Sequence, residues 1–143
     1  MTEATQDRRI VLACMARGRG PEPLWPRPSG SAGHRLYAMI RDATGWPMEE
    51  YLSRTVRVAF CPGTVWTLDE ARSRLEEVRS MIAGRRTIAI GVPAARLLEA
   101  PPEWCEWSED GVAAIPHTAG VSLAYNDPDV RASVVAFLKS ALQ

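Results

Sequence analysis

The chain has 143 residues, of which 46% are hydrophobic and 24% charged, and its formal net charge is zero. This length suits one domain, and this composition excludes wholesale disorder. No apolar run approaches the roughly 20 residues of a membrane-spanning helix, and the polar N-terminus resembles neither a secretory signal nor a transit peptide. We therefore expect a cytoplasmic protein with no membrane partner, a loose tail over residues 1–8 and a single domain over residues 9–143.

The three cysteines indicate neither a disulfide framework nor a metal site. Cys14, Cys61 and Cys105 are odd in number, far apart in the sequence and without a C-x-x-C spacing. Structural zinc and secreted disulfide scaffolds need closely spaced or paired cysteines. We expect three reduced, buried thiols and no metal.

The zero net charge hides a basic segment near the N-terminus. Between Arg8 and Arg41 there are seven arginines and one acid, Glu22, an excess of six positive charges. Such a segment is suited to contact phosphate groups. Alternatively, it reflects a general preference for arginine, because Lys139 is the single lysine among 17 basic residues.

Four segments predict the strands of a sheet. Ile10–Met15 is a continuous apolar run, which is typical of a strand buried on both faces. Val56–Phe60 alternates apolar residues with other residues, and Thr87–Gly91 and Val112–Ile115 are short and apolar. We also expect a short edge strand over Trp104–Trp107.

Helices are expected between these strands. The first begins near Ser31–Gly33, runs to about Ala43 and is closed by Gly45. The sequence further predicts a short helical turn over 47–52, a helix opened by the capping box at Thr67 and stopped by Gly84, a helix over 93–98, and a last helix capped by Asp127.

This alternation predicts a three-layer α/β/α fold with a central, mainly parallel four-stranded sheet. Ligands of such sheets bind beyond the carboxyl ends of the strands. Four segments reach that edge, over residues 17–33, 61–66, 91–93 and 117–126. The first holds four of the eleven prolines and four of the ten glycines, and long irregular loops of this kind are usually functional.

Three passages resemble motifs of the uracil-DNA glycosylase superfamily, in its compact bacterial and phage-type members. They are GPEPLWPRPSGSAGHRL (20–36), TIAIGVPAARLL (87–98) and IPHTAGVSLAYNDP (115–128). Their order and spacing extend the resemblance from about Arg9 to Leu142. It implies a monomeric enzyme of DNA repair that binds single-stranded or duplex DNA, flips a base into a pocket and hydrolyses its N-glycosidic bond without a cofactor.

The chain departs from the family at several positions. Met15–Gly20 has no acid or amide where the family carries a residue that positions water, and Ala59 and Phe60 stand where the family often reads the base with Asn. Thr118 and Ala119 replace the usual Pro and Ser after the motif histidine. Three cysteines cannot supply the four ligands of the family's iron–sulfur branch. The resemblance therefore implies a modified base rather than plain uracil as the target.

Four residues are candidates for the pocket. By the resemblance, His117 stabilises the departing base anion and Trp25 stacks on the flipped base. Glu22 would position water or serve as a general acid, and Phe60 would contact the base. The alternatives are a loop histidine bonded to backbone, a tryptophan that anchors the loop to the core, and a surface acid paired with arginine.

Further residues are candidates for contact with DNA. Arginines of the first loop would meet phosphates, or would occupy the place of the missing acid and block the family reaction. The serine hydroxyls before the first helix would bind phosphate, or they would simply cap the helix. The loop after His117 would enter the minor groove of DNA, or it would pack on the protein. These candidates are Arg17, Arg19, Arg27, Ser29, Ser31, Gly120, Val121, Ser122 and Leu123.

Two other functions remain open at this point. The same pocket would serve a binding module that holds DNA, a base or a nucleotide without cleavage. Alternatively, the fold would serve contact between proteins.

Overall fold

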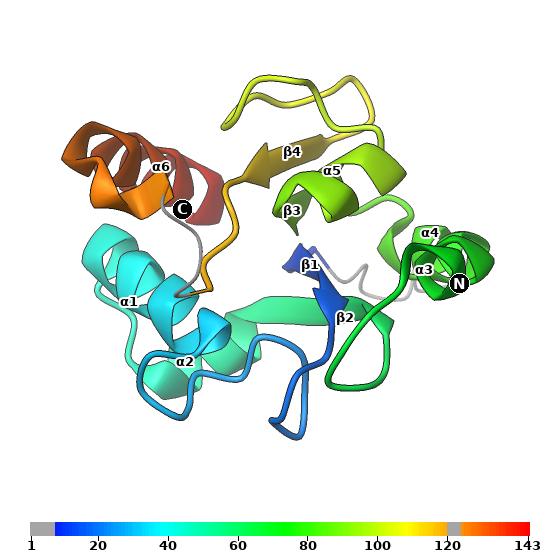
Figure 1. The fold of residues 1–143 in the computed structure, drawn as a ribbon. Helices are drawn as coiled ribbons and strands as arrows, with labels where there is room; N and C mark the ends of the chain where they lie inside the picture. Colours follow the sequence, from blue (N-terminus) through cyan, green and yellow to red (C-terminus); the bar gives the residue numbers. More distant parts are fainter. Residues whose placement is uncertain (1–7, 120–123) are drawn as a thin grey trace, which may run out of the picture.

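The computed structural model describes residues 8–119 and 124–143. Its centre is a four-stranded sheet in the order β2-β1-β3-β4, in which every neighbouring pair is parallel (Figure 1). The sequence-based prediction of four core strands is thereby confirmed. The strands are β1 (Ile10–Ala16), β2 (Thr55–Cys61), β3 (Thr87–Ile90) and β4 (Val112–Ile115).

The first strand lies in the middle of the sheet. It pairs with β2 from Ile10↔Thr55 to Ala16↔Cys61 and with β3 at Leu12↔Ile88. Helices cover both faces of β1, so six of its seven residues are buried. This explains why the strand reads as an unbroken apolar run rather than an alternating one.

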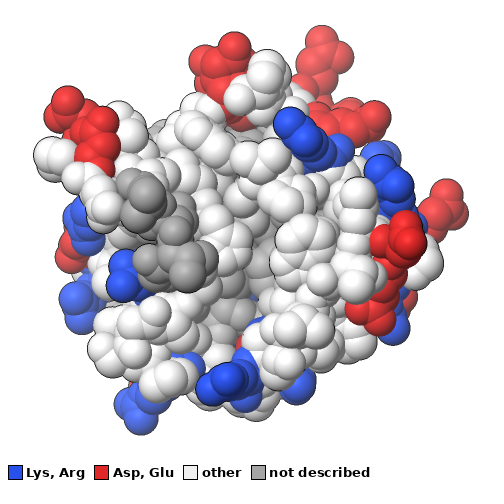
Figure 2. Space-filling view, viewed as in Figure 1, with Lys and Arg blue, Asp and Glu red and all other residues white. Residues whose placement is uncertain are grey.

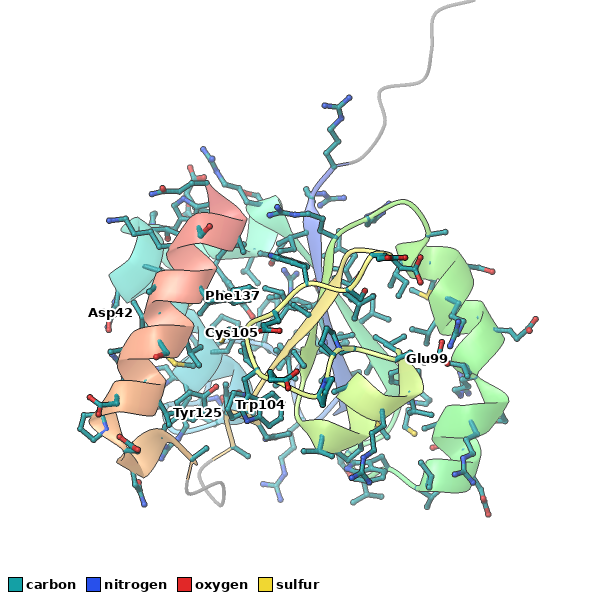
Figure 3. All side chains as sticks on the ribbon, turned by 90° about the horizontal axis from the view of Figure 1, so that it is seen from above. Asp42, Glu99, Trp104, Cys105, Tyr125 and Phe137 are labelled. Atoms are coloured by element: carbon teal, nitrogen blue, oxygen red, sulfur yellow. The ribbon has the colours of Figure 1, made fainter. Side chains whose placement is uncertain are left out.

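Helices pack on both faces of the sheet, which gives the expected three-layer α/β/α fold (Figures 1 and 3). One core contains Leu12, Ile88 and Ile115 and the other contains Val11, Val58 and Ala114, so neighbouring residues of one strand face opposite layers. The first layer is formed by α1 (Ala32–Thr44), α2 (Met48–Arg54) and α6 (Pro128–Leu142), and the second by α3 (Leu68–Ser73), α4 (Leu75–Ile82) and α5 (Val92–Leu97).

The expected helix caps are present. The Ser31 side chain accepts a hydrogen bond from the backbone N–H of His34, and the Thr67 side chain accepts one from that of Glu70. Gly45 ends α1 with a φ of 77°, a left-handed conformation that favours glycine. Asp127 caps α6, whose first residue is Pro128 as predicted.

Two predicted elements differ from the structure. The helix expected from Thr67 to Gly84 is divided at Arg74, whose N–H bonds back to the carbonyl of Ala71, a tighter turn than an α-helix makes. The edge strand expected over Trp104–Trp107 is wrong. Cys105 has a φ of 65°, which interrupts an extended chain, and this segment keeps only two backbone bonds to β4, from Cys105 to Ala114 and from Ser108 to Val112.

Cys14 and Cys61 are buried, Cys105 is half-buried, and all three are free thiols. Burial raises the pKa of the Cys14 thiol to about 12, so this thiol stays protonated. Within residues 8–119 and 124–143, no helix is long and apolar enough to cross a membrane.

Candidate functional site

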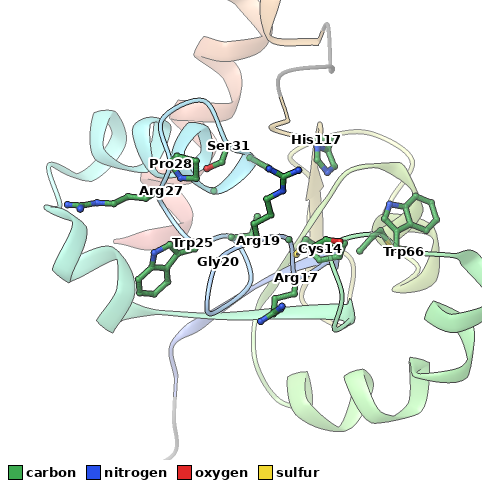
Figure 4. A pocket seen from close by; sticks show the side chains of 17 residues that line it. Cys14, Arg17, Arg19, Gly20, Trp25, Arg27, Pro28, Ser31, Trp66 and His117 are labelled. Atoms are coloured by element: carbon green, nitrogen blue, oxygen red, sulfur yellow. Dashed lines mark hydrogen bonds between the residues drawn. The ribbon is translucent and has the colours of Figure 1, made fainter.

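A cavity of about 460 Å³ opens at the carboxyl edge of the sheet (Figure 4). The long loop after β1, the segment after β2 and the residues after β4 all contribute to its walls. Trp25 and His117, predicted from sequence to share a pocket although 92 positions separate them, both line it. The polar and aromatic side chains of its lining are Arg17, Arg19, Trp25, Arg27, Ser31, Thr64, Trp66 and His117.

The loop after β1 is held by buried contacts rather than by regular structure. The Tyr51 hydroxyl donates a 2.8 Å hydrogen bond to the carbonyl oxygen of Leu24, and Leu24 itself is buried in the core. Gly33, in the first turn of α1, lies directly against the loop. A Cβ at Gly33 would lie 2.1 Å from the carbonyl oxygen of Trp25. The backbone before Trp25 is therefore fixed against α1 and α2.

A buried arginine holds the same loop from the side of β2. The Arg57 side chain is only 6% exposed and donates to Glu22 at 2.6 Å and to the Thr55 hydroxyl at 2.7 Å. Its guanidinium also lies 5.5 Å from the ring centroid of Tyr51. The carboxylate of Glu22 is thus engaged by Arg57, and Glu22 does not line the cavity. The structure therefore matches the alternative of an arginine-paired acid and does not place Glu22 beside Trp25 and His117.

His117 is positioned with one ring nitrogen engaged. The backbone N–H of Ala119 donates to its Nδ1 at 2.9 Å. Burial lowers the pKa of His117, which favours the neutral ring at pH 7. Because Nδ1 accepts, the proton of the neutral ring is on Nε2, and this nitrogen is a donor.

Neighbouring residues fix the place of this imidazole. Gly91 has a φ of 91°, and a Cβ there would lie 3.1 Å from Cδ2 of His117. The buried hydroxyl of Thr118 donates to the carbonyl oxygen of Ala32 at 2.8 Å, which ties the segment after β4 to the start of α1. The Tyr125 hydroxyl donates to the carbonyl oxygen of Pro116 at 2.7 Å. The structure thus gives the Thr118 hydroxyl a positioning contact beside His117.

The cavity wall is basic. Arg17, Arg19 and Arg27 all line it, and in Figure 4 the side chain of Arg19 extends towards His117 and Ser31. The Nε of Arg17 is buried without a hydrogen-bond partner among the described residues. Ser29 lies outside this cavity, in an adjoining hollow that also reaches Trp25 and Arg27.

Acidic side chains are missing from the described lining. In the space-filling view they gather at the upper and right margins of the face, whereas the central hollow is bordered mostly by uncharged side chains (Figure 2). A donor-rich wall without carboxylates favours an anionic, acceptor-rich ligand.

The remaining predicted residues divide into two groups. Phe60 is 1% exposed and lies in the core between the sheet and α3 and α4. It does not line the cavity, because the side-chain alternation along β2 directs it into the opposite layer, so the structure does not bring it together with Trp25 and His117. Gly120, Val121, Ser122 and Leu123 lie outside the described residues.

Thr64 and Trp66 line the cavity although sequence reasoning did not select them. Both lie in the segment after β2 that was expected at the functional edge. An isolated tryptophan at the end of a strand, beside glycine and proline, was the available signal.

Within the described part of the chain, no three His, Cys, Asp or Glu residues are grouped as metal ligands would be. The fold and the cavity together define an α/β domain with a basic, aromatic-lined cavity at the carboxyl edge of its sheet. In comparisons with models of protein families and with curated proteins, no match to this chain was found.

Proposed function

We propose that this protein is a DNA glycosylase-like enzyme that takes one base of DNA into the cavity and hydrolyses its N-glycosidic bond. The observation that carries the proposal is the neutral His117, whose Nε2–H is left to donate because Nδ1 is engaged by Ala119. It stands in a cavity lined by three arginines and two tryptophans.

The lining fits the two parts of a nucleotide. Arginine side chains bind phosphate and release its counterions, and the indole ring of Trp25 offers a flat face to a base. The cavity of about 460 Å³ is within the range of small-molecule sites. A base would be read through its acceptor atoms, because the ionised side chains of the described lining are all donors.

The reaction follows from the position of the donor. The bond between C1′ and the base nitrogen breaks, and its electron pair leaves with the base. The Nε2–H of His117 donates a hydrogen bond to this anion and stabilises it. The sugar then has oxocarbenium character, water adds to C1′, and the proton that water releases passes to solvent while the base takes up another.

The structure also supports a second candidate, a binding module that does not cleave. The observation in its favour is the pairing of Glu22 with Arg57, which leaves the described lining without a carboxylate to orient water. Glycosidic hydrolysis often uses such a carboxylate. In this case the cavity would retain a base or nucleotide unchanged.

A cleavage assay combined with a binding assay separates the two. Oligonucleotides carrying uracil or an altered base are incubated with the protein, and base release and retention on the protein are both measured. Release that falls roughly 10²-fold or more in His117→Ala supports the enzyme. Tight binding without release of any base supports the binding module.

The matched control is His34→Ala, which removes the only other histidine. His34 accepts a hydrogen bond from the N–H of Gly30 and does not line the cavity. Equal loss in both variants would mean that the first loop was disturbed and would count against a direct role of His117. Failure of the wild-type protein to bind any oligonucleotide, free base or mononucleotide would overturn both candidates.

A further inference from the structure

We propose that Trp66 and the groove beyond it bind the nucleotide next to the one in the cavity, so that the preferred ligand is single-stranded DNA of several nucleotides. This inference rests on the proposed function and adds a second subsite to it. The observation behind it is that Trp66 belongs to two hollows at once, the cavity and a groove of about 610 Å³ that runs between α3 and α5.

Three of the six large hydrophobic side chains that are exposed in the described part of the chain line the groove. The exposed fractions are 41% for Trp66, 41% for Leu68 and 44% for Val92, and all three line the groove. Val65, next to Trp66, is 76% exposed. Exposed apolar clusters of this kind mark binding surfaces.

The charges along the groove select a phosphate-bearing occupant. Its lining contains Arg72, Arg79 and Arg96 and a single acid, Glu99. Glu99 accepts a hydrogen bond from Arg79 at 3.3 Å, so this pair is mutually compensated. Two further cations remain, which favours a polyanion over an uncharged apolar segment of another protein.

The geometry of the tryptophans favours a single strand. Figure 4 places Trp25 and Trp66 on opposite sides of the space below His117. A base stacked on Trp66 must present an open face, which a paired and stacked duplex does not offer. A strand that leaves the cavity across Trp66 would have its next phosphates beside Arg72 and Arg96.

The test is the dependence of affinity on oligonucleotide length. Binding of a fluorescent mononucleotide and of single-stranded oligonucleotides of two to eight nucleotides is measured for the wild-type protein. The readout is the affinity for the longest oligonucleotide divided by the affinity for the mononucleotide. Trp66→Ala should reduce this ratio by about 5- to 150-fold, the effect of losing one base–aromatic stack. Using the ratio removes any change that the substitution causes in the cavity itself.

Trp104→Ala is the matched control. Trp104 is 39% exposed, close to the value for Trp66, and lines neither the cavity nor the groove. Its removal should leave the ratio as in the wild type. A double Arg72→Ala, Arg96→Ala variant should lower the salt dependence of oligonucleotide binding more than that of mononucleotide binding.

The outcomes are separable. If Trp66→Ala keeps the wild-type ratio, this inference is overturned while the proposed function stands. If duplex DNA of equal length binds more tightly than the single strand, the inference is also overturned. If Trp66→Ala changes only self-association in sedimentation, the groove is a contact between copies. If the wild-type protein binds no oligonucleotide, the proposed function fails and this inference fails with it.

Discussion

The two walls of the cavity, neither of which is regular secondary structure, are built in opposite ways. The wall after β1 is fixed by a buried tyrosine hydroxyl, a buried guanidinium and a glycine in contact with its backbone. The wall after β2 is exposed at every residue from 62 to 67. Among the described residues, two backbone hydrogen bonds join it to the first wall. The N–H of Arg17 donates to the carbonyl oxygen of Cys61, and the N–H of Gly18 donates to that of Gly63.

This difference shows that the contacts around a loop, rather than its content of glycine and proline, decide how firmly the loop is held. Backbone polar groups that lack a ladder must find other partners. In the first wall the Tyr51 hydroxyl of α2 is such a partner for Leu24, and Arg57 of β2 holds the loop through the carboxylate of Glu22. A prearranged wall of this kind suits selective recognition, because little ordering cost remains when the ligand binds. The exposed wall suits contacts that tolerate different bases.

The largest effect that distinguishes the walls is expected from Gly33→Ala. Its Cβ would lie 2.1 Å from the carbonyl oxygen of Trp25, so the backbone must move. We expect the free energy of unfolding to fall by about 2–3 kcal/mol, together with loss of ligand affinity, measured by chemical denaturation and by titration.

The matched substitution in the other wall is Gly63→Ala. The nearest atom to its Cβ would be 3.7 Å away, so the change in stability should stay within about 0.5 kcal/mol. Equal damage in both variants would show that the second wall is as tightly constrained as the first and would break the comparison.

Tyr51→Phe should give the next largest effect. It removes the 2.8 Å hydrogen bond to the carbonyl of Leu24 and leaves that buried acceptor without its donor. The expected loss of stability is about 1–3 kcal/mol, with weaker ligand binding because the first wall relaxes. Tyr37→Phe is the control, since that hydroxyl donates to Trp46, away from the cavity. Reduced affinity in both variants would show that the effect is not specific to the wall.

The change in stability with pH that comes from His117, which lies between the walls, should be smaller than the effects of Gly33→Ala and Tyr51→Phe. Burial lowers the pKa of the folded state below the unfolded value of 6.5, so the unfolded chain takes up its proton first as pH falls. The contribution of His117 to the free energy of unfolding is complete above the pKa of the unfolded state. Below that pKa it falls by at most about 1.4 kcal/mol per pH unit, until the pH has passed the pKa of the folded state.

His117→Asn isolates this contribution. Unfolding free energies of the two proteins are compared between pH 7.5 and pH 5, roughly the window in which histidine titrates. The advantage of the wild type should shrink as pH falls. An advantage that grows on acidification would mean that the folded protein prefers the charged imidazole and would contradict the donor role of a neutral ring.

The smallest effect is expected from Glu22→Gln. The Glu22 side chain is 53% exposed, so solvent screens its pair with Arg57, and stability should change by no more than about 1 kcal/mol. Base release, where it occurs, should stay close to the wild-type rate. A loss of release as large as in His117→Ala would show that this carboxylate reaches the ligand and that the first wall moves when DNA binds.

Much of the fold follows from local signals in the sequence. Ser31 and Asp127 begin helices and Gly45 ends one, through backbone and capping chemistry that acts within a few residues. The apolar run at Ile10 requires two covered faces. The division at Arg74 was not predictable in this way, because both halves continue the same apolar periodicity.

The site was predictable only in part. The edge at which Trp25 and His117 meet follows from parallel strand order. The partner of Glu22 does not, since Arg57 is 35 positions away and their pairing depends on how the loop folds back over β2. Phe60 illustrates the same limit, because a shift of one residue along a strand moves a side chain from the layer beside the cavity to the opposite layer.

The central place of β1 also has a consequence for biosynthesis. The ribosome releases this strand first, yet its second neighbour, β3, follows more than 70 positions later, and Leu36 and Ile40 on α1 share a core with Val134 and Leu138 at the end of the chain. The nascent domain therefore carries a half-finished sheet with an open edge until β3 and β4 have been made, which exposes it to mispairing and to chaperones. Long-range pairing of this kind predicts slow folding relative to the size of the domain.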